Sequence, residues 1–221
     1  MSQSAQTLPN SQSDDIPNNE FTARQNAVLA VGLRLIVEGG EKALTTAGLA
    51  KAANCSKESL YKWFGDRDGI LSAIVVFQAS KVRGAEERAS PATQQAFEEA
   101  LTIFAEDLLS VLLSESSLAL NRLSVGAVRG QESGLGAVLV EHGKRRIETR
   151  AIHLLTHGKR QRFLSFGEAH EAYSTLYGLV IGDAHIRALL GDTPTVHSQD
   201  YPSRAKQAVA RFLALYSNVN L

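Results

Sequence analysis

The sequence predicts an all-α protein, with an N-terminal three-helix bundle that contains a helix-turn-helix and a longer helical domain after it. Apolar residues recur at helical spacing, and no segment shows the alternation of a half-buried strand. Only five prolines interrupt the chain, and 44% of its 221 residues are hydrophobic, enough for long helices and a sizeable core.

Composition also indicates where the protein works. No apolar run approaches the roughly 20 residues that span a bilayer, and the N-terminus lacks a charged-then-apolar signal. The single cysteine, Cys55, excludes an internal disulfide. We therefore expect a soluble, cytoplasmic protein without a membrane partner.

The chain begins with a polar segment and then a scaffold helix. Residues 1–20 are rich in Ser, Gln, Asn and Pro, so we expect a disordered tail. The first helix is expected over about residues 22–38, and it ends at Gly39-Gly40. Its apolar face is formed by Val28, Val31, Leu35 and Ile36.

Residues 44–71 are expected to form two short helices joined by a tight turn, followed by the start of a third. Thr45 or Thr46 can cap the first, because a hydroxyl there accepts a bond from an otherwise orphaned backbone N–H. Asn54 tolerates the left-handed conformation that the turn requires. Ser56 is a suitable cap for the second helix.

The second of these helices has different inner and outer sides. Leu60 and Phe64, at i and i+4, point inward. The outer side carries basic, aromatic and hydroxylated residues, which are Lys57, Ser59, Tyr61, Lys62 and Trp63. Such a helix suits insertion into a DNA major groove. The alternative is a small helical subdomain in which Tyr61 and Trp63 merely pack, although the inward positions are already filled.

Positive charge is concentrated in this region. The whole chain has 23 basic and 23 acidic residues and no net charge. Residues 21–67 hold seven basic and four acidic residues, whereas residues 1–20 hold three acidic and no basic ones. Since phosphate contacts need positive charge, the distribution favours DNA binding by residues 21–67.

The same region resembles the DNA-binding domain of the TetR/AcrR (tetracycline-repressor-like) transcriptional regulators. The matching positions lie within residues 24–75 and are Leu44-Thr45-Thr46, Leu49-Ala50, Leu60-Tyr61, Phe64, Arg67 and Ile70-Leu71. Two positions depart from the family pattern, with Asn54 in place of Gly and Arg67 in place of Lys. Asn can adopt the same backbone conformation, and Arg keeps a phosphate-binding charge.

The resemblance implies a DNA-binding domain over residues 21–67 and a ligand-binding and dimerisation domain over residues 68–221. It implies a homodimer that binds a palindromic operator in double-stranded DNA and that a small, largely apolar effector releases. We therefore expect a ligand-responsive transcriptional regulator, in particular a repressor. By analogy, Thr46, Tyr61, Trp63 and Arg67 hold phosphates, and Lys57, Ser59 and Lys62 read base edges.

The rest of the chain is expected to be helical. A helix over about residues 67–88 is apolar on nearly every side, so it should be buried against both halves of the protein. After Ser90-Pro91, further helices are expected at about 93–113, 116–129, 134–157, 168–190 and 203–217. The basic segment 159–167 is expected to be a solvated turn, with DNA contact as the alternative.

The last two expected helices are predicted to form the dimer interface. The final helix carries an apolar stripe, and two glycines on one face of the preceding helix permit close approach of another backbone. The predicted interface residues are Gly178, Leu179, Gly182, Ile186, Ala205, Val209, Phe212 and Tyr216. The alternative is that both stripes pack inside one monomer.

Because the resemblance implies a ligand-binding domain, the helices at about 97–113 and 116–129 are predicted to border a pocket. They are rich in Leu, Val, Phe and Ala, and a mostly apolar cavity with a few polar groups is the usual form of a ligand site. The predicted lining is Phe104, Leu108, Asn121, Arg122, Val125, Tyr173 and Tyr177. The alternative is a solid core, with Arg122 extending to solvent and the tyrosines at the dimer seam.

Signals for catalysis or metal binding are weak. His153 and His157 have a metal-compatible spacing, but no Cys or Glu completes a known motif. Cys55 is expected to pack like a small apolar residue, with redox sensing as the alternative. Glu168 and His170 could form an acid–base pair, but a helix-capping Glu is simpler. We predict no enzyme, cofactor or metal. The alternative function is a helical carrier or enzyme whose N-terminal bundle is only structural.

Overall fold

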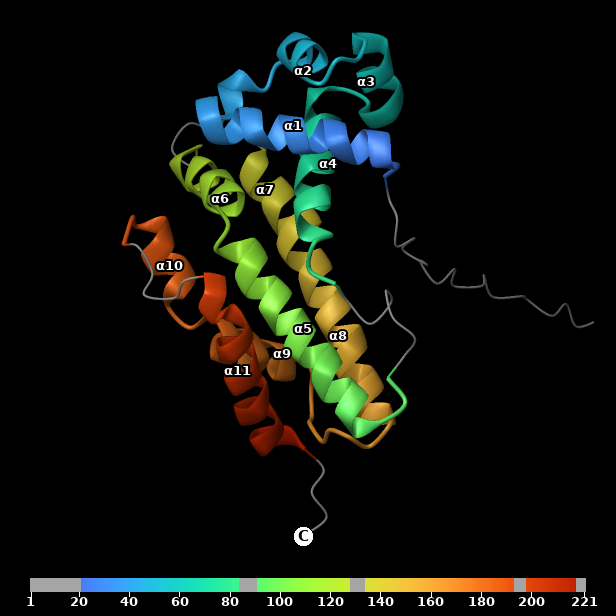
Figure 1. Cartoon of the computed structure of the whole chain (residues 1–221), viewed down its shortest axis with the longest axis vertical. Helices are drawn as coiled ribbons and strands as arrows, with labels where there is room; N and C mark the ends of the chain where they lie inside the picture. Colours follow the sequence, from blue (N-terminus) through green and yellow to red (C-terminus); the bar gives the residue numbers. More distant parts are fainter. Residues whose placement is uncertain (1–20, 84–90, 128–133, 193–197, 218–221) are drawn as a thin grey trace, which may run out of the picture.

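A computed structural model describes residues 21–83, 91–127, 134–192 and 198–217. Within these ranges the helices are the only regular secondary structure, apart from one isolated bridge between Leu164 and Ser217, so the predicted all-α class is confirmed. The molecule is elongated, with α1, α2 and α3 at one end and the remaining helices stacked lengthwise (Figure 1). None of the helices in the described ranges has the length and apolar character needed to cross a membrane. The predicted tail, residues 1–20, lies outside the described residues.

The N-terminal bundle consists of α1 (Ala23–Gly39), α2 (Thr46–Ala52) and α3 (Lys57–Phe64), with the short η1 (Glu41–Ala43) after α1. Thr22 starts α1 with a capping box, in which its hydroxyl accepts from the Gln25 N–H and the Gln25 side chain accepts from the Thr22 N–H. Leu29, Leu49 and Leu60 are fully buried where the three helices meet.

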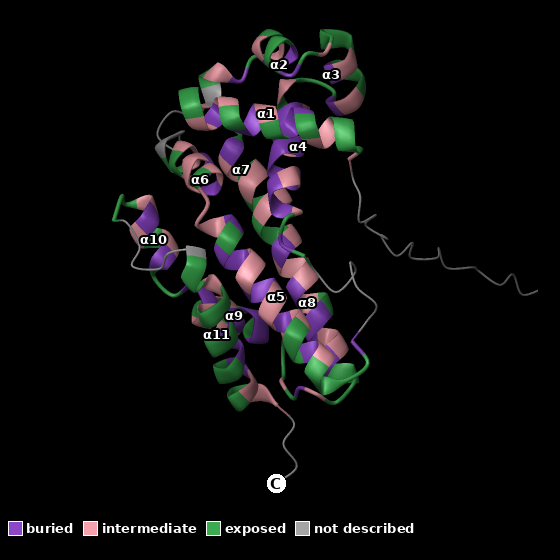
Figure 2. Cartoon of the chain, in the orientation of Figure 1, coloured by how far each residue is buried: buried purple, intermediate pink, exposed green. Residues whose placement is uncertain are grey.

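Helix α4 (Arg67–Ala79) connects the two halves of the molecule (Figure 1). It packs against α1 at one end and against η3 (Leu139–Lys144) of the second half. Figure 2 shows its predominantly buried surface, as the apolar sequence predicts. The helix ends at Ala79 instead of near residue 88, because Ser80 to Val82 leave the helical path in a turn.

The second half is a helical bundle that extends from α5 to α11. Besides η3, its elements are α5 (Gln94–Leu112), α6 (Glu115–Ala127), α7 (Leu135–Val138), α8 (Arg145–Arg160), α9 (Ala169–Ile181), α10 (Ala184–Leu189), η4 (Ser198–Asp200) and α11 (Tyr201–Tyr216). The segments α7, η3 and α8 follow one another as a single helical rod, with a π-helical stretch in its middle. Gly143 of that stretch approaches Val75 of α4 closely, and a Cβ there would lie 3.3 Å from Val75 Cγ1.

The prediction of a single helix over residues 168–190 is wrong, because α9 ends at Ile181 and a separate helix, α10, begins at Ala184. Gly182 ends α9 with a positive φ of 54°, a conformation that glycine adopts readily. Arg204 of α11 then donates to the carbonyl oxygens of Val180 (2.8 Å) and Ile181 (2.8 Å). These bonds satisfy C-terminal carbonyls of α9 that have no partner within the helix, and they hold α11 against α9.

The apolar stripe of α11 packs inside the protomer. Ala205, Val209 and Phe212 are at most 1% exposed, and α11 lies against α5 and α9. The placement of these three residues at a dimer interface is therefore wrong, since their side chains already fill the core of one chain. Of the other predicted interface residues, Gly178, Gly182 and Ile186 are exposed, and Leu179 and Tyr216 are half-buried.

The basic segment 159–167 lies at the end of the molecule opposite to α3 (Figure 1). Leu164 is buried, the Ser165 N–H donates to the Tyr216 carbonyl (2.7 Å), and Lys159 Nζ donates to the Gly167 carbonyl (3.1 Å). The segment is thus tied to the C-terminal end of α11. This position argues against the alternative that it shares a DNA surface with α3.

Candidate functional site

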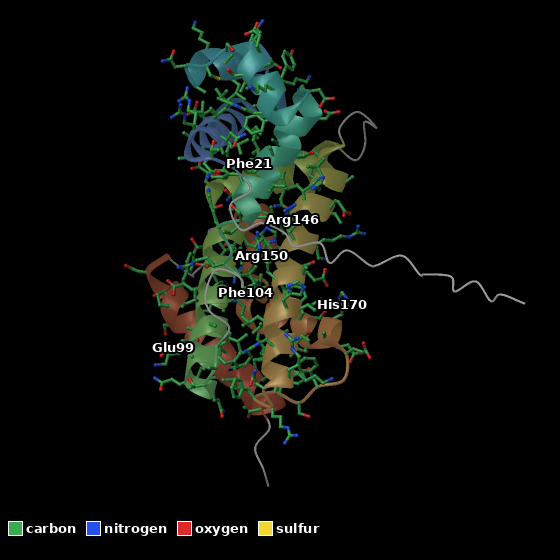
Figure 3. All side chains as sticks on the ribbon, turned by 90° about the vertical axis from the view of Figure 1, so that its right-hand side faces the viewer. Phe21, Glu99, Phe104, Arg146, Arg150 and His170 are labelled. Atoms are coloured by element: carbon green, nitrogen blue, oxygen red, sulfur yellow. The ribbon has the colours of Figure 1, made fainter. Side chains whose placement is uncertain are left out.

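Helix α3 is presented at the tip of the molecule by two fixed ends. The Ser56 hydroxyl accepts from the Ser59 N–H (3.1 Å) at its start, and Gly65 terminates it with a positive φ of 77°. Leu60 is fully buried and Phe64 is 8% exposed, so the inner side is anchored as predicted. Phe64 also packs edge-on against the ring of Phe21, at the entry to α1 (Figure 3).

The outer side of α3 is open to solvent. Lys57, Tyr61 and Lys62 are exposed, and Ser59 is half-buried. Trp63 is less accessible than predicted, since it packs partly against the bundle core and lies edge-on to the Phe64 ring. Glu58, in the first turn of α3, is also exposed, although it was not among the residues predicted for the outer side.

The turn before α3 is held rigidly by α1. Asn54 has a φ of 49°, which confirms the predicted left-handed conformation. Arg24 donates to the carbonyl oxygens of Ala53 (2.9 Å) and Asn54 (2.8 Å). Because the guanidinium spans both carbonyls, the orientation of α3 relative to α1 is fixed from outside the turn.

Two further predicted contact residues lie beside α3. Thr45, and not Thr46, caps α2 by accepting from the Gly48 N–H (3.0 Å), so Thr46 is not needed as the cap. Arg67 begins α4 and is half-buried, with its Nε donating to the Leu44 carbonyl (3.3 Å). Arg67 therefore has a structural contact in addition to any role at the surface.

A partly open cavity of about 140 Å³ lies between α4 and the helices of the second half. Helices α4, α5, α6, α8, α9 and α10 contribute to its wall together with η3. Eight of the sixteen lining residues have apolar side chains, namely Val75, Ala79, Leu108, Val111, Leu112, Leu120, Leu139 and Ile147, and Gly143 adds backbone. The polar lining residues are Gln78, Ser117, Asn121, Lys144, Tyr173, Tyr177 and His185.

The cavity includes some of the predicted lining residues but not others. Leu108, Asn121, Tyr173 and Tyr177 lie in its wall. Three predicted residues lie elsewhere, which corrects their assignment. Phe104 is 1% exposed in the core of the bundle (Figure 3), and Val125 is 70% exposed on α6. Arg122 donates to the carbonyls of Ala188 and Leu189, where it caps the end of α10.

Four polar lining residues were not predicted from the sequence, namely Gln78, Ser117, Lys144 and His185. The positions of Gln78 and His185 depend most on the tertiary structure. Gln78 interrupts the apolar face of α4, and its Nε2 donates to the hydroxyls of Ser114 (3.0 Å) and Ser117 (3.2 Å). Its Oε1 accepts from Lys81 Nζ (2.8 Å). His185 comes from the short α10, and burial lowers its pKa below the ordinary value.

Burial also fixes the protonation of the two tyrosines. The pKa of Tyr173 is raised by burial first and then by the neighbouring Tyr177 and Glu148. The pKa of Tyr177 is raised by burial. Both phenols therefore remain neutral at physiological pH, and they pack against each other with ring centroids 6.0 Å apart.

Acid should destabilise this protein partly through His185. The unfolded chain protonates near the ordinary pKa of 6.5, whereas burial lowers the pKa of folded His185 below it. Between these values the unfolded state binds more protons, so the stabilisation present above pH 6.5 is lost as the pH falls. Tyr173 and Tyr177 stay neutral there, and Lys144 shares the wall as a cation. As the pH falls below 6.5, the melting temperature should decrease more steeply for wild type than for His185→Leu. Equal dependence of the melting temperature on pH in the two proteins would contradict this assignment.

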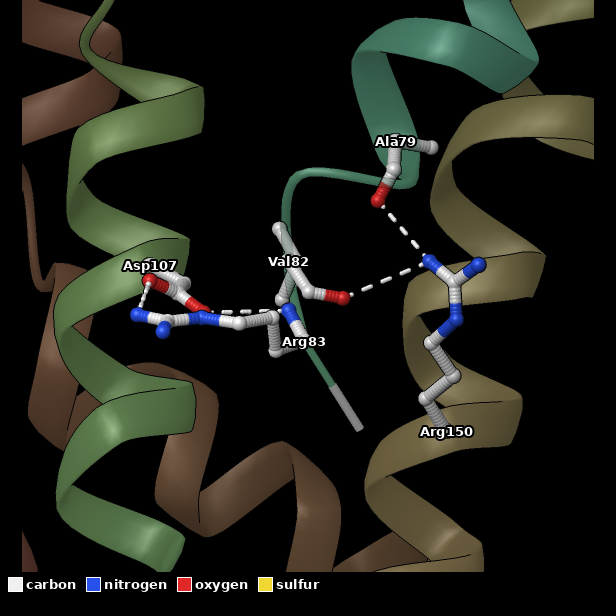
Figure 4. Close-up of polar contacts among 5 residues, drawn as sticks. All are labelled: Ala79, Val82, Arg83, Asp107 and Arg150. Atoms are coloured by element: carbon white, nitrogen blue, oxygen red, sulfur yellow. Dashed lines mark hydrogen bonds and ion pairs between the residues drawn. The ribbon is translucent and has the colours of Figure 1, made fainter. Parts of the chain in front are cut away.

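The C-terminal end of α4 is clamped to the helices that surround the cavity (Figure 4). From α8, Arg150 donates to the carbonyls of Ala79 (2.9 Å) and Val82 (3.3 Å). From α5, Asp107 accepts from the Arg83 N–H (3.0 Å), its Nε (2.7 Å) and a terminal nitrogen (2.8 Å). Charge-assisted and bidentate bonds of this kind are strong, so this end of α4 is firmly held.

The other candidate pairs from the sequence have simpler roles. His157 Nε2 lies 2.9 Å from the Pro91 carbonyl. His170, at the surface in Figure 3, pairs with Glu148 (3.0 Å) and not with Glu168. Glu168 stands at the N-cap of α9, as the interpretation of a helix-start Glu predicts, and its side chain makes no capping hydrogen bond. Across the described residues, no three His, Cys, Asp or Glu side chains converge as a metal site would require.

Comparison with known protein families assigns both halves of the chain. The family model "Bacterial regulatory proteins, tetR family" matches residues 28–74. The model "AefR-like transcriptional repressor, C-terminal domain" matches residues 99–218. No curated protein matches the chain at a significant level.

Solved structures agree with this assignment. A TetR transcriptional regulator from Agrobacterium tumefaciens is 51% identical, with a TM-score of 0.73, and the match covers 89% of this chain and 96% of that one. A TetR-family regulator from Mesorhizobium loti shares the fold, with 20% identity and a TM-score of 0.66 over 88% of this chain and 96% of that one. The flavonoid-responsive regulator FrrA also shares the fold, with 21% identity and a TM-score of 0.63 over 89% of this chain and 98% of that one. The chain therefore belongs to the TetR family of bacterial transcriptional regulators, which are DNA-binding proteins and not enzymes.

Proposed function

We propose that the protein is a homodimeric repressor that binds a palindromic operator through α3 and is released by a small effector bound in the cavity. The observation that carries this proposal is the division of α3 into two sides. Leu60 and Phe64 tie its inner side to the bundle, while Lys57, Tyr61 and Lys62 face solvent at the tip of the molecule. A rigid helix with a basic outer side suits a DNA major groove.

Two kinds of contact with DNA are proposed. Lys57, Ser59 and Lys62 lie on α3 itself, where side chains can reach base edges. By analogy with the family, the residues proposed to contact phosphates are Thr46, Tyr61, Trp63 and Arg67. Partial burial restricts the Trp63 side chain, and the hydrogen bond to the Leu44 carbonyl restricts that of Arg67. This restriction would favour a fixed contact of each side chain with the DNA backbone over an adaptable one.

Helix α4 is suited to couple the cavity to α3. Val75, Gln78 and Ala79 of α4 form part of the cavity wall, and the start of the same helix follows α3 directly. Because Arg150 and Asp107 hold its C-terminal end, a ligand that presses on this wall would displace mainly the N-terminal end. The effector must bind the DNA-incompetent arrangement more tightly, otherwise it shifts no population.

The dimer is proposed to form over the exposed faces of α9, α10 and α11. Gly178 has open space around its α-carbon, so another backbone can approach closely. Ile186 and Leu215 add exposed apolar surface, with 54% and 65% exposure. Two-fold symmetry of such a dimer would match a palindromic operator, whose half-sites lie about one DNA turn (~34 Å) apart.

Replacing Ile186 by aspartate should weaken the dimer, because an unpaired carboxylate would have to be buried at the interface. We expect the dimer dissociation constant to rise about tenfold or more, measured by analytical ultracentrifugation. Val140→Asp is the matched control, since Val140 is 47% exposed on η3, outside the proposed interface. A monomer at micromolar concentration with operator binding intact would contradict the proposed dimer.

A further inference from the structure

One buried polar atom on the cavity wall has no partner. Among the described residues, His185 Nε2 is the buried side-chain nitrogen or oxygen without a hydrogen bond. His185 lies on α10, and it faces the cavity together with residues of α4, α5 and α9. Leaving such an atom unpaired costs free energy, and a ligand group that bonds to it would recover that cost.

The neighbouring amide side chains are already engaged. Gln78 donates to the hydroxyls of Ser114 and Ser117 and accepts from Lys81. Asn121 donates through Nδ2 to the Ser117 carbonyl (2.8 Å). A polar group entering the cavity therefore finds its clearest unsatisfied partner in His185 and not in these amides.

The rest of the wall sets the size and polarity of the ligand. The cavity measures about 140 Å³, and an apolar cavity of about 150 Å³ accommodates benzene. Leu108, Val111, Leu120 and Ile147 present methyl groups around it. A compact molecule of about one ring, apolar over most of its surface, matches these dimensions.

The charges around the cavity favour a neutral ligand. Among the lining residues, Lys144 carries a formal charge, and its side chain is exposed. Tyr173 is buried and Tyr177 is half-buried, and both are neutral phenols; Glu148 lies near enough to Tyr173 to raise its pKa further. An anion moved into this wall would lose its hydration without gaining a buried cation, which is costly.

The unpaired atom also specifies the polar group. A neutral imidazole has one nitrogen that donates and one that accepts, depending on the tautomer. A hydroxyl can donate and accept, so it can pair with Nε2 in either tautomer. The hydroxyls of Tyr173 and Tyr177, in the same wall, can take up the remaining bond of the ligand.

We propose that the cavity binds a small uncharged molecule of about one ring whose single hydroxyl pairs with His185 Nε2. The proposal rests on the effector role of the cavity and names the chemical class of the effector.

Three probe compounds of similar size test this class on the full chain, namely phenol, toluene and benzoate. Thermal shift and calorimetric titration are compared for wild type, His185→Leu and the control His153→Leu, whose histidine is exposed on α8 outside the cavity wall. Wild type and His153→Leu should bind phenol about two- to tenfold more tightly than toluene, the worth of one hydrogen bond. His185→Leu should bind both equally, and benzoate should bind weakest in all three.

A labelled-histidine NMR spectrum of wild type gives a second measurement that needs no variant. The ring nitrogens of His185 should shift with phenol and not with toluene. Equal binding of phenol and toluene by wild type, tighter binding of benzoate, binding of none of the three, or a phenol preference that survives in His185→Leu would overturn the proposal.

Operator affinity, measured separately, distinguishes this proposal from the proposed switch. Phenol that binds through His185 without changing operator affinity would support the ligand class and contradict the release mechanism. Release of the operator by benzoate alone would support the release mechanism and contradict the ligand class.

Discussion

Replacing Gly69 by alanine is expected to destabilise the protein by about 1–3 kcal/mol and to lower operator affinity at least tenfold, by roughly 1.4 kcal/mol or more. Gly69 lies in the first turn of α4, where its N–H donates to the capping carboxylate of Asp66 (2.9 Å). An added Cβ would overlap the carbonyl oxygen of Phe64, the last residue of α3. Because that atom belongs to the backbone, no side-chain rotation relieves the overlap.

The relief must come from a shift between the end of α3 and the start of α4. Such a shift would misplace Lys57, Tyr61 and Lys62 on DNA without altering any of them. Gly134→Ala is the matched control, since a Cβ meets nothing within 4 Å there and its φ of −68° suits alanine. Chemical denaturation and fluorescence anisotropy measure the two effects. Wild-type stability and affinity in Gly69→Ala would show that this contact does not position α3.

Replacing Lys62 by alanine is expected to cost about 1–3 kcal/mol at the operator and to relax specificity at the base pairs it reads. Lys62 is exposed in the last turn of α3, so its removal should leave the fold unchanged. Tyr61→Ala, at a predicted phosphate contact, should instead weaken binding to all sequences about equally.

Lys206→Ala is a control for lost positive charge, because Lys206 is exposed on α11 in the other half of the protein. Affinities of these variants are compared for the operator and for unrelated DNA over a range of salt concentrations. Operator binding equal to wild type in both Lys62→Ala and Tyr61→Ala would mean that another surface contacts DNA.

The helix-turn-helix could be predicted from sequence because its determinants are local. The caps at Thr45 and Ser56 and the left-handed Asn54 each act within a few residues. Leu60 and Phe64 then identify the inner side of α3, since the three helices share a small core. The outer side follows by exclusion, without knowledge of distant contacts.

The second half was less predictable because its decisive contacts are long-range. An apolar stripe such as Ala205, Val209 and Phe212 shows that one face of α11 is buried, but not whether its partner belongs to the same chain. Arg204 from α11 decides how α9 ends, and this contact cannot be read from α9 itself.

The cavity shows the same limit. Gln78 and His185 look like isolated polar residues in sequence, and they line one cavity only because α10 packs against α6. Arg122 shows the converse case, since its position on a predicted pocket helix suggested a ligand contact. Its guanidinium instead caps α10, a helix whose start could not be located before the break at Gly182 was known.

Sequencing the DNA fragments that the purified protein retains at moderate salt tests the central proposal most directly. If α3 of each protomer enters a major groove, the retained fragments should share one two-fold symmetric site with half-site centres about one DNA turn (~34 Å) apart. The Lys62→Ala protein should retain the same fragments less strongly and with weaker preference within each half-site. Retention of DNA without a common sequence, or a common site without two-fold symmetry, would contradict a homodimeric repressor that reads DNA through α3.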